Sequence, residues 1–219
     1  LPEYDEFSPH AGSGLYRCVV KDIFQAEEKA MDLHALLKDN SQIISPLKNG
    51  VGGTNSINEF IHKVYYNRCN FSPETPVIYT QNMKLSIKNE GFPVEIKNGS
   101  MGVVKRVLNE NPKFNEAYLL VDFDVEGELY LTWSEVSQYL ELSYALTIHK
   151  AQGSDWENVI IVAPNHEKLI DRNMIYTALS RCKVRAIIVY YDHKYLSRKI
   201  GSLPAHDKRK SGLFVRNNV

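Results

Sequence analysis

Long apolar runs and paired cysteines are both scarce in this sequence. A membrane-spanning helix needs about 20 apolar residues, whereas the most apolar stretch, Val159–Pro164, ends after a handful. The three cysteines, Cys18, Cys69 and Cys182, are odd in number, far apart and in no spacing typical of metal ligands. These absences exclude a membrane span, a disulfide framework and a zinc site, and they favour a reducing, cytoplasmic environment.

The sequence also lacks an excess of charge and two motifs of nucleotide hydrolases. Lys+Arg and Asp+Glu both total 26, so the net charge is zero and gives no global argument for a polyanionic partner. No Gly-x-x-x-x-Gly-Lys-Ser/Thr loop occurs, and no apolar strand ends in the acidic pair that holds Mg²⁺. Because the chain begins at Leu1 without a signal sequence, we expect it to be a piece of a longer polypeptide.

The outer parts of the chain alternate between helical and strand patterns. Helices are expected at 24–38, from residue 54 or 55, at 172–180 and at 193–200, and strands at 42–45, 142–148, 159–162 and 186–190. The last two strands are apolar without alternation, as expected where helices cover both faces of a parallel sheet. We therefore expect residues 1–70 and 141–203 to form one α/β domain, followed by a basic tail at 204–219.

Residues 71–140 have a different pattern, in which short β-rich runs are separated by turn residues. The runs are 77–80, 94–97, 102–107, 117–123 and 129–133. Asn98-Gly99 is a strong hairpin signal because both residues tolerate positive φ. Five short strands in about 70 residues predict a small β-barrel inserted into the α/β domain.

The most informative segment, residues 144–162, reads YALTIHKAQGSDWENVIIV. An apolar strand delivers hydroxyl, imidazole, ammonium and amide groups into a glycine turn, and a second apolar strand follows at once. Polar groups at the carboxyl end of a strand lie where α/β sheets bind ligands. The alternative is a polar loop with a capped turn and no ligand.

A second segment, residues 173–183, reads NMIYTALSRCK and precedes the strand at 186–190. Arg181 ends the expected helix, and its planar guanidinium can bind phosphate oxygens bidentately at any working pH. The alternative is a surface arginine stabilised by the dipole at the end of the helix.

The two segments resemble motifs V and VI of superfamily 1 DNA helicases, in the RecD-like version. A third segment, residues 42–58, resembles the motif IV strand and glycine loop of the same family. The resemblance implies that the α/β part is a RecA-like second motor domain, and that Arg181 is the catalytic residue, reaching the γ-phosphate of ATP. It also assigns further residues, which are Gly153, Asp155 and Lys48 for ATP, and Thr147, His149, Lys150 and Gln152 for single-stranded DNA. Asp155 stands where the family more often has glutamate, and Asn49 replaces the second basic residue of the motif IV loop.

The inserted β region is similar to the SH3-like barrel of RecD-like helicases, on the evidence of residues 79–82 and 98–104. Such barrels can stack DNA bases on aromatic side chains. Tyr79 is the DNA-binding candidate here, with Phe92 and Trp133 as further base platforms. The alternative for each of them is a core residue.

The sequence therefore predicts the carboxy-terminal part of an ATP-dependent DNA helicase. ATP and Mg²⁺ are expected to be held mainly by a missing N-terminal motor domain of the same polypeptide, so that this chain alone hydrolyses no ATP. An adaptor that binds nucleic acid but has no motor activity is the main alternative, and a purely structural α/β domain is the third.

Overall fold

A computed structural model describes residues 14–37, 41–68, 70–85, 94–166 and 170–201. The chain divides into an α/β unit, residues 1–57 with 146–219, and a β unit, residues 58–145. Phe92, Cys69 and the basic tail at 204–219 lie outside the described residues.

The α/β unit is built on a five-stranded sheet in the order β1-β12-β11-β2-β10. Its strands are β1 (Gly14–Val19), β2 (Ser41–Ser45), β10 (Ala145–Thr147), β11 (Trp156–Val162) and β12 (Cys182–Tyr190). β1 is parallel to β12, β12 to β11, and β11 to β2. The expected α/β class with a parallel sheet is confirmed.

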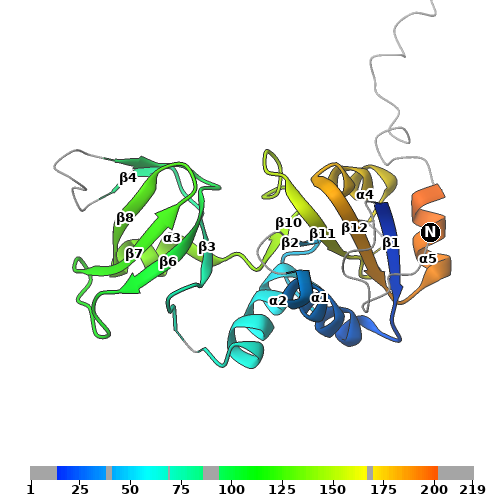
Figure 1. The fold of residues 1–219 in the computed structure, drawn as a ribbon, viewed down its shortest axis with the longest axis horizontal. Helices are drawn as coiled ribbons and strands as arrows, with labels where there is room; N and C mark the ends of the chain where they lie inside the picture. The colour runs from blue at the N-terminus through cyan, green and yellow to red at the C-terminus, as the bar shows by residue number, and fades with distance from the viewer. Residues whose placement is uncertain (1–13, 38–40, 69, 86–93, 167–169, 202–219) are drawn as a thin grey trace, which may run out of the picture. The chain divides into compact units, whose positions relative to one another are not determined.

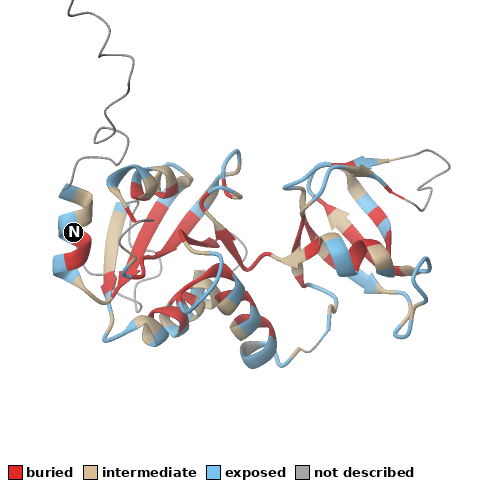
Figure 2. Cartoon of the chain, turned by 180° about the vertical axis from the view of Figure 1, so that it is seen from behind, coloured by how far each residue is buried: buried red, intermediate tan, exposed pale blue. Residues whose placement is uncertain are grey.

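Helices cover the sheet on both faces. They are α1 (Ile23–Leu37), α2 (Thr54–Phe60), α4 (Arg172–Leu179) and α5 (His193–Gly201). The crossover from β1 to β2 and the crossover from β11 to β12 run in opposite directions along the sheet. Right-handed connections therefore place α1 and α4 on opposite faces (Figure 1). Figure 2 shows the consequence, which is that the central strands are buried, including Val159–Val162 with 0% exposure.

The strand expected at 142–148 is confirmed only at Ala145–Thr147, and its bounds are wrong. Leu140–Leu142 forms β9 in the sheet of the β unit, whereas Ala145–Thr147 forms β10 beside β2. Ser143 and Tyr144 separate the two strands. An apolar run cannot reveal this break, because both strands are partly or fully buried and only their partners differ.

The β unit contains a five-stranded antiparallel sheet in the order β8-β7-β6-β3-β9. Its strands are β3 (Pro76–Tyr79), β6 (Met101–Val107), β7 (Ala117–Phe123), β8 (Gly127–Thr132) and β9. Between β3 and β6 in the sequence, β4 (Met83–Lys84) and β5 (Glu95–Ile96) pair as a separate two-stranded antiparallel sheet. The core includes Val104, Leu119, Val121, Phe123 and Leu131.

Helix α3 (Trp133–Tyr139) connects β8 to β9. Thr132 and Glu135 form a capping box, in which the Thr132 hydroxyl accepts from the Glu135 amide and the Glu135 carboxylate accepts from the Thr132 amide. The sequence prediction placed Trp133 at the end of a strand, but it is the first residue of this helix. A capping box directly after a strand ends the strand one residue earlier than the apolar pattern indicates.

The hairpin predicted at Asn98-Gly99 is also wrong. Gly99 does adopt a left-handed φ of 96°. The strands on either side are not partners of each other in the described pairings, since β5 pairs with β4 and β6 pairs with β3. The turn is instead fixed against β3, where Gly99 N donates to Tyr79 O at 2.7 Å.

Candidate functional site

A tight turn follows β10 and carries the residues predicted to contact DNA. Thr147 O accepts from Ala151 N at 2.9 Å, which closes one helical turn, and Thr147 Oγ1 accepts from Lys150 N at 3.4 Å. Ile148 and Ala151 are buried and anchor the turn. His149 and Gln152 are exposed, and Lys150 is half-buried. The structure thus brings these four polar residues together on one short turn.

Gly153 ends this turn in the left-handed region, with a φ of 94°. A β-carbon at this position would meet no atom within 4 Å. The glycine is therefore required by its backbone conformation, which L side chains adopt at a cost, and not by crowding. It redirects the chain toward Asp155 and the start of β11.

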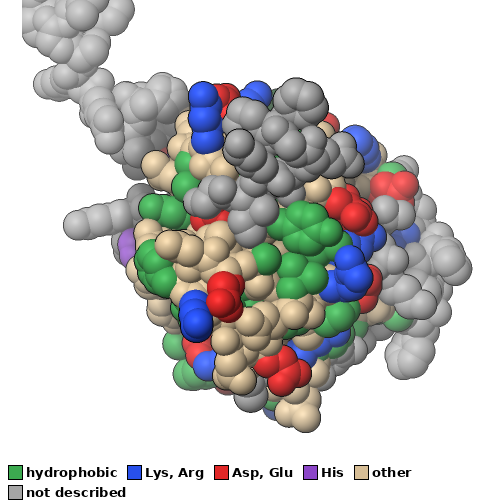
Figure 3. Space-filling model, turned by 90° about the vertical axis from the view of Figure 1, so that its left-hand side faces the viewer, with side chains coloured by type: hydrophobic (Ala, Val, Ile, Leu, Met, Phe, Trp, Pro, Cys, Tyr) green, Lys and Arg blue, Asp and Glu red, His purple; other side chains and the backbone are tan. Residues whose placement is uncertain are grey.

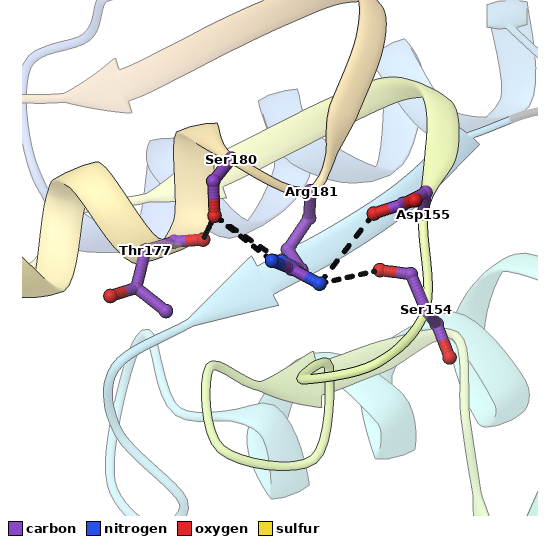
Figure 4. Close-up of polar contacts among 5 residues, drawn as sticks. All are labelled: Ser154, Asp155, Thr177, Ser180 and Arg181. Atoms are coloured by element: carbon purple, nitrogen blue, oxygen red, sulfur yellow. Dashed lines mark hydrogen bonds and ion pairs between the residues drawn. The ribbon is translucent and has the colours of Figure 1, made fainter.

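The Arg181 guanidinium lies in a polar cluster before the first residues of β11 and β12 (Figure 4). It forms an ion pair with the Asp155 carboxylate at 3.5 Å and donates to Ser154 O at 3.4 Å. Two further bonds, at 3.1 and 3.4 Å, run to the Ser180 hydroxyl, which itself donates to Thr177 O at 2.8 Å. Arg181 and Asp155, both predicted nucleotide contacts, are therefore neighbours.

The backbone fixes this cluster independently of the side chains. Trp156 N donates to Arg181 O at 2.9 Å, which joins the residue before β12 to the first residue of β11. The Arg181 side chain is 23% exposed and that of Asp155 is 47% exposed. A half-exposed carboxylate is readily exchanged for another anion, because solvent screens the ion pair.

Ser154 and Ser180 were not predicted as site residues. They hold the guanidinium through a backbone carbonyl and a hydroxyl, as described above. Ser180 could have been found from its position directly before Arg181, but the sequence carries no signal that Ser154 would lie opposite.

Lys48 does not join the other predicted nucleotide residues. It follows the carboxyl end of β2, whereas Asp155 precedes the amino end of β11, and the two strands are parallel. β11 has seven residues, which at about 3.3 Å each put about 20 Å between the two edges of the sheet. The Lys48 loop packs at the carboxyl edge, where Gly52 N donates to the buried Glu27 carboxylate at 2.6 Å. The structure therefore places Lys48 at the opposite edge of the sheet from Arg181, and its assignment to ATP stays a prediction.

Tyr79 is wrong as a base platform. Its ring has 0% exposure in the core of the β unit, edge-on to Phe123 at 6.4 Å, and its hydroxyl bonds Met83 Sδ at 2.9 Å. No face of the ring is open to a base. Trp133, by contrast, is 39% exposed and packs edge-on against Tyr118 at 5.0 Å.

Charge does not concentrate on the face shown in Figure 3, where basic and acidic side chains are scattered among hydrophobic and neutral ones. Among the described residues, no group of three or more His, Cys, Asp or Glu side chains could hold a metal ion. Cys18 and Cys182 carry free thiols. In the described part of the chain, no helix is both long and apolar enough to cross a membrane.

Comparison with known proteins relates the chain to DNA helicases. Residues 142–189, which contain both the turn and Arg181, match the UvrD-like helicase C-terminal domain. The ATP-dependent RecD2 DNA helicase of Deinococcus radiodurans is 31% identical over 153 residues, which are 66% of this chain and 19% of that protein. The RecBCD enzyme subunit RecD of Buchnera aphidicola is 26% identical over 156 residues, 66% of this chain and 24% of that protein.

The fold has counterparts among solved structures. A structure titled for DNA unwinding at forked dsDNA by two coordinating Pif1 helicases matches with a TM-score of 0.51 and 19% identity, over 85% of this chain and 49% of that one. The identity is low, so this likeness concerns the fold alone. The matched part of this chain spans about a fifth to a quarter of the curated relatives' length.

Proposed function

We propose that this chain contains the C-terminal domain of a RecD-like superfamily 1 DNA helicase and is the second motor domain of an ATP-driven helicase, a proposal supported by the match of residues 142–189 and by the likeness to the RecD2 helicase. In this proposal it binds single-stranded DNA and supplies an arginine to an ATP site shared with a first motor domain. The observation that carries the proposal is the Arg181 cluster, in which a guanidinium is held beside a replaceable carboxylate at one edge of the sheet.

The nucleotide side of the proposal uses Gly153, Asp155 and Arg181. The planar fork of the guanidinium suits the γ-phosphate, and a released Asp155 carboxylate can accept a hydrogen bond from the ribose. In this proposal the phosphate-binding loop, which this sequence lacks, and the ligands of Mg²⁺ belong to the partner domain. When ATP is bound, Mg²⁺ would neutralise charge on its phosphates.

The DNA side uses Thr147, His149, Lys150 and Gln152. Their hydroxyl, imidazole, ammonium and amide groups suit the phosphates and sugars of a single strand, which are the usual backbone contacts of DNA-binding proteins. In the β unit we propose Trp133 in place of Tyr79 as the aromatic platform, because its ring is partly exposed. The order β8-β7-β6-β3-β9 with a helix before the last strand supports an SH3-like identity for this unit.

The first experiment tests both activities on the chain itself. We expect the purified chain to show no ATP turnover and to bind a fluorescein-labelled oligo(dT) weakly, with an affinity that falls as salt rises. His149→Ala should weaken binding about fivefold to tenfold, whereas His193→Ala, at an exposed histidine on α5, should not.

Two results would contradict the proposal. ATP turnover by the chain alone, abolished by Arg181→Ala, would show that the nucleotide site is complete without a partner domain. Equal binding by wild type and His149→Ala would remove the turn after β10 from the DNA site. Binding without any ATPase in the longer polypeptide would favour the adaptor alternative.

A further inference from the structure

The chain passes between its two units twice, and one side chain ties these passages together. Asn58 is the first residue of the β unit and Ala145 is the last. The Asn58 Oδ1 atom accepts from Ala145 N at 2.7 Å, and its Nδ2 atom donates to Ala145 O and to Leu142 O, both at 3.0 Å. Residues more than 80 positions apart in sequence are thereby joined by three hydrogen bonds.

The Asn58 carboxamide has no good substitute at this position. Its side chain is buried with 8% exposure, and Ala145 has 1%. A carboxamide offers two N–H donors and one carbonyl acceptor, and all three functions are used here. Without it, one backbone donor and two acceptors would lose a partner in a buried place, where unpaired polar groups are costly.

Two further residues on the same side of this helical segment hold the intervening Tyr144. The π-helix η2 (Ile61–Tyr65) continues directly from α2, and Tyr66 N donates to Ile61 O at 3.1 Å. His62 Nδ1 lies 3.3 Å from the Tyr144 hydroxyl, and the Tyr66 ring stacks on the Tyr144 ring at 5.6 Å. π-helical turns of this kind are frequent at functional sites. Residues 142–145 are thus held along their length by one helical face.

We propose that Asn58 is a positioning residue for the turn after β10. Only Leu146 separates the clamped Ala145 from Thr147, the first residue of that turn. Asn58 is not proposed to contact DNA or nucleotide. It fixes the backbone from which Thr147 and His149 project, so that these side chains are already oriented when a strand arrives. This inference rests on the DNA-binding role proposed above for the turn.

The test measures backbone mobility and DNA binding separately. In hydrogen-exchange mass spectrometry of the chain, Asn58→Ala should speed exchange at residues 145–151 at least about tenfold, because three hydrogen bonds are lost. Asn58→Asp should do the same, because a carboxylate would face the carbonyl oxygens of Leu142 and Ala145. The control Asn55→Ala, on the same helix at an exposed side chain that bonds Asn49, should leave this exchange unchanged.

Affinity for oligo(dT) should fall in Asn58→Ala about as far as in His149→Ala. Protected amides of β7 serve as the check that the β unit remains folded. If Asn58→Ala unfolds it, Tyr66→Ala gives a milder change, because this half-exposed ring stacks on Tyr144 and packs against the Arg68 guanidinium but takes no part in the three hydrogen bonds of Asn58. It should speed exchange at residues 145–151 about twofold to threefold.

Two outcomes overturn the positioning role. The first is exchange at residues 145–151 that stays at the wild-type rate in both Asn58→Ala and Tyr66→Ala. The second is Asn58→Asp behaving as wild type, which would mean that Asn58 only fills space. Exchange that rises as expected, together with normal oligo(dT) affinity in His149→Ala, would support the positioning role of Asn58 and refute the DNA-binding role of the turn.

Discussion

Arg181→Ala offers a sharp test of the proposed nucleotide site, because the structure predicts a small effect on stability whereas the proposed role predicts a large one on turnover. The side chain makes one ion pair at 3.5 Å with a carboxylate that is 47% exposed. Such pairs contribute about 0.2–1 kcal/mol. Three of its four polar contacts are 3.4 Å or longer, which makes them weak hydrogen bonds. We expect a total stability loss of about 1 kcal/mol, equivalent to about 2–4 °C in Tm for a chain of this size.

The expected loss of catalysis is far larger. An arginine that stabilises the transferring phosphoryl group contributes about 10³ to 10⁵ in rate, which corresponds to about 4–7 kcal/mol. The assay is DNA-stimulated ATP turnover by the longer polypeptide of the proposal, in which this chain is joined to a domain with a phosphate-binding loop. Binding of single-stranded DNA should remain within about twofold, because the turn after β10 is intact in this variant.

Three companion variants separate charge, geometry and position. Arg181→Lys keeps the charge but loses the planar fork, so most of the turnover should still be lost. Ser180→Ala removes the hydroxyl that holds the guanidinium at 3.1 Å, and should lower turnover about tenfold or less. Lys183→Ala, at an exposed cation on β12, is the control. A Tm loss above about 10 °C, or less than a tenfold loss of turnover, would show that Arg181 is a structural residue.

Two other predictions concern stability. Gly52→Ala should cost about 1 kcal/mol more than Gly50→Ala in denaturant unfolding, because both have φ near 80° but only a β-carbon on Gly52 would meet Ile23, at 2.7 Å; equal costs would contradict this packing. Burial of His62, assisted by Arg68 and Lys63, lowers the pKa of its imidazole below the usual 6.5. The unfolded state therefore takes up a proton first, and the stability of the β unit should be full above about pH 6.5 and fall below it, by no more than about 1.4 kcal/mol per pH unit. His62→Gln should flatten this dependence in thermal melts at pH 5 to 8, and an unchanged profile would rule out this histidine as its source.

The sequence alone was sufficient for features that depend on local pattern. The unbroken apolar run at Val159–Val162 predicted a strand covered on both faces, and its side chains are fully buried. The order of groups from Thr147 to Asp155 predicted a polar turn between two strands, which the structure contains. Both features can be read from the order of neighbouring residues, although the burial of this strand comes from its pairing with β12 and β2.

Features that depend on distant partners were not predictable in the same way. The location of Lys48 depends on which edge of the sheet its loop occupies, and that follows from the pairing of β2 with β11. Tyr79 has an aromatic ring on which a base could stack. The pairing of β3 with β6 and β9, however, directs this ring into the core. No pattern around β1 indicated a strand, because it lies at the edge of the sheet and only Cys18 in it is buried.

The backbone hydrogen bond from Trp156 to Arg181 connects the turn after β10 to the Arg181 cluster. Arg181 is tied to the first residue of β11, and only eight residues separate that residue from Thr147. Gly153, with its left-handed φ, lies within this short link. In the proposed function, this link would be the shortest route along the backbone between the residue that meets phosphate and the residues that meet the strand.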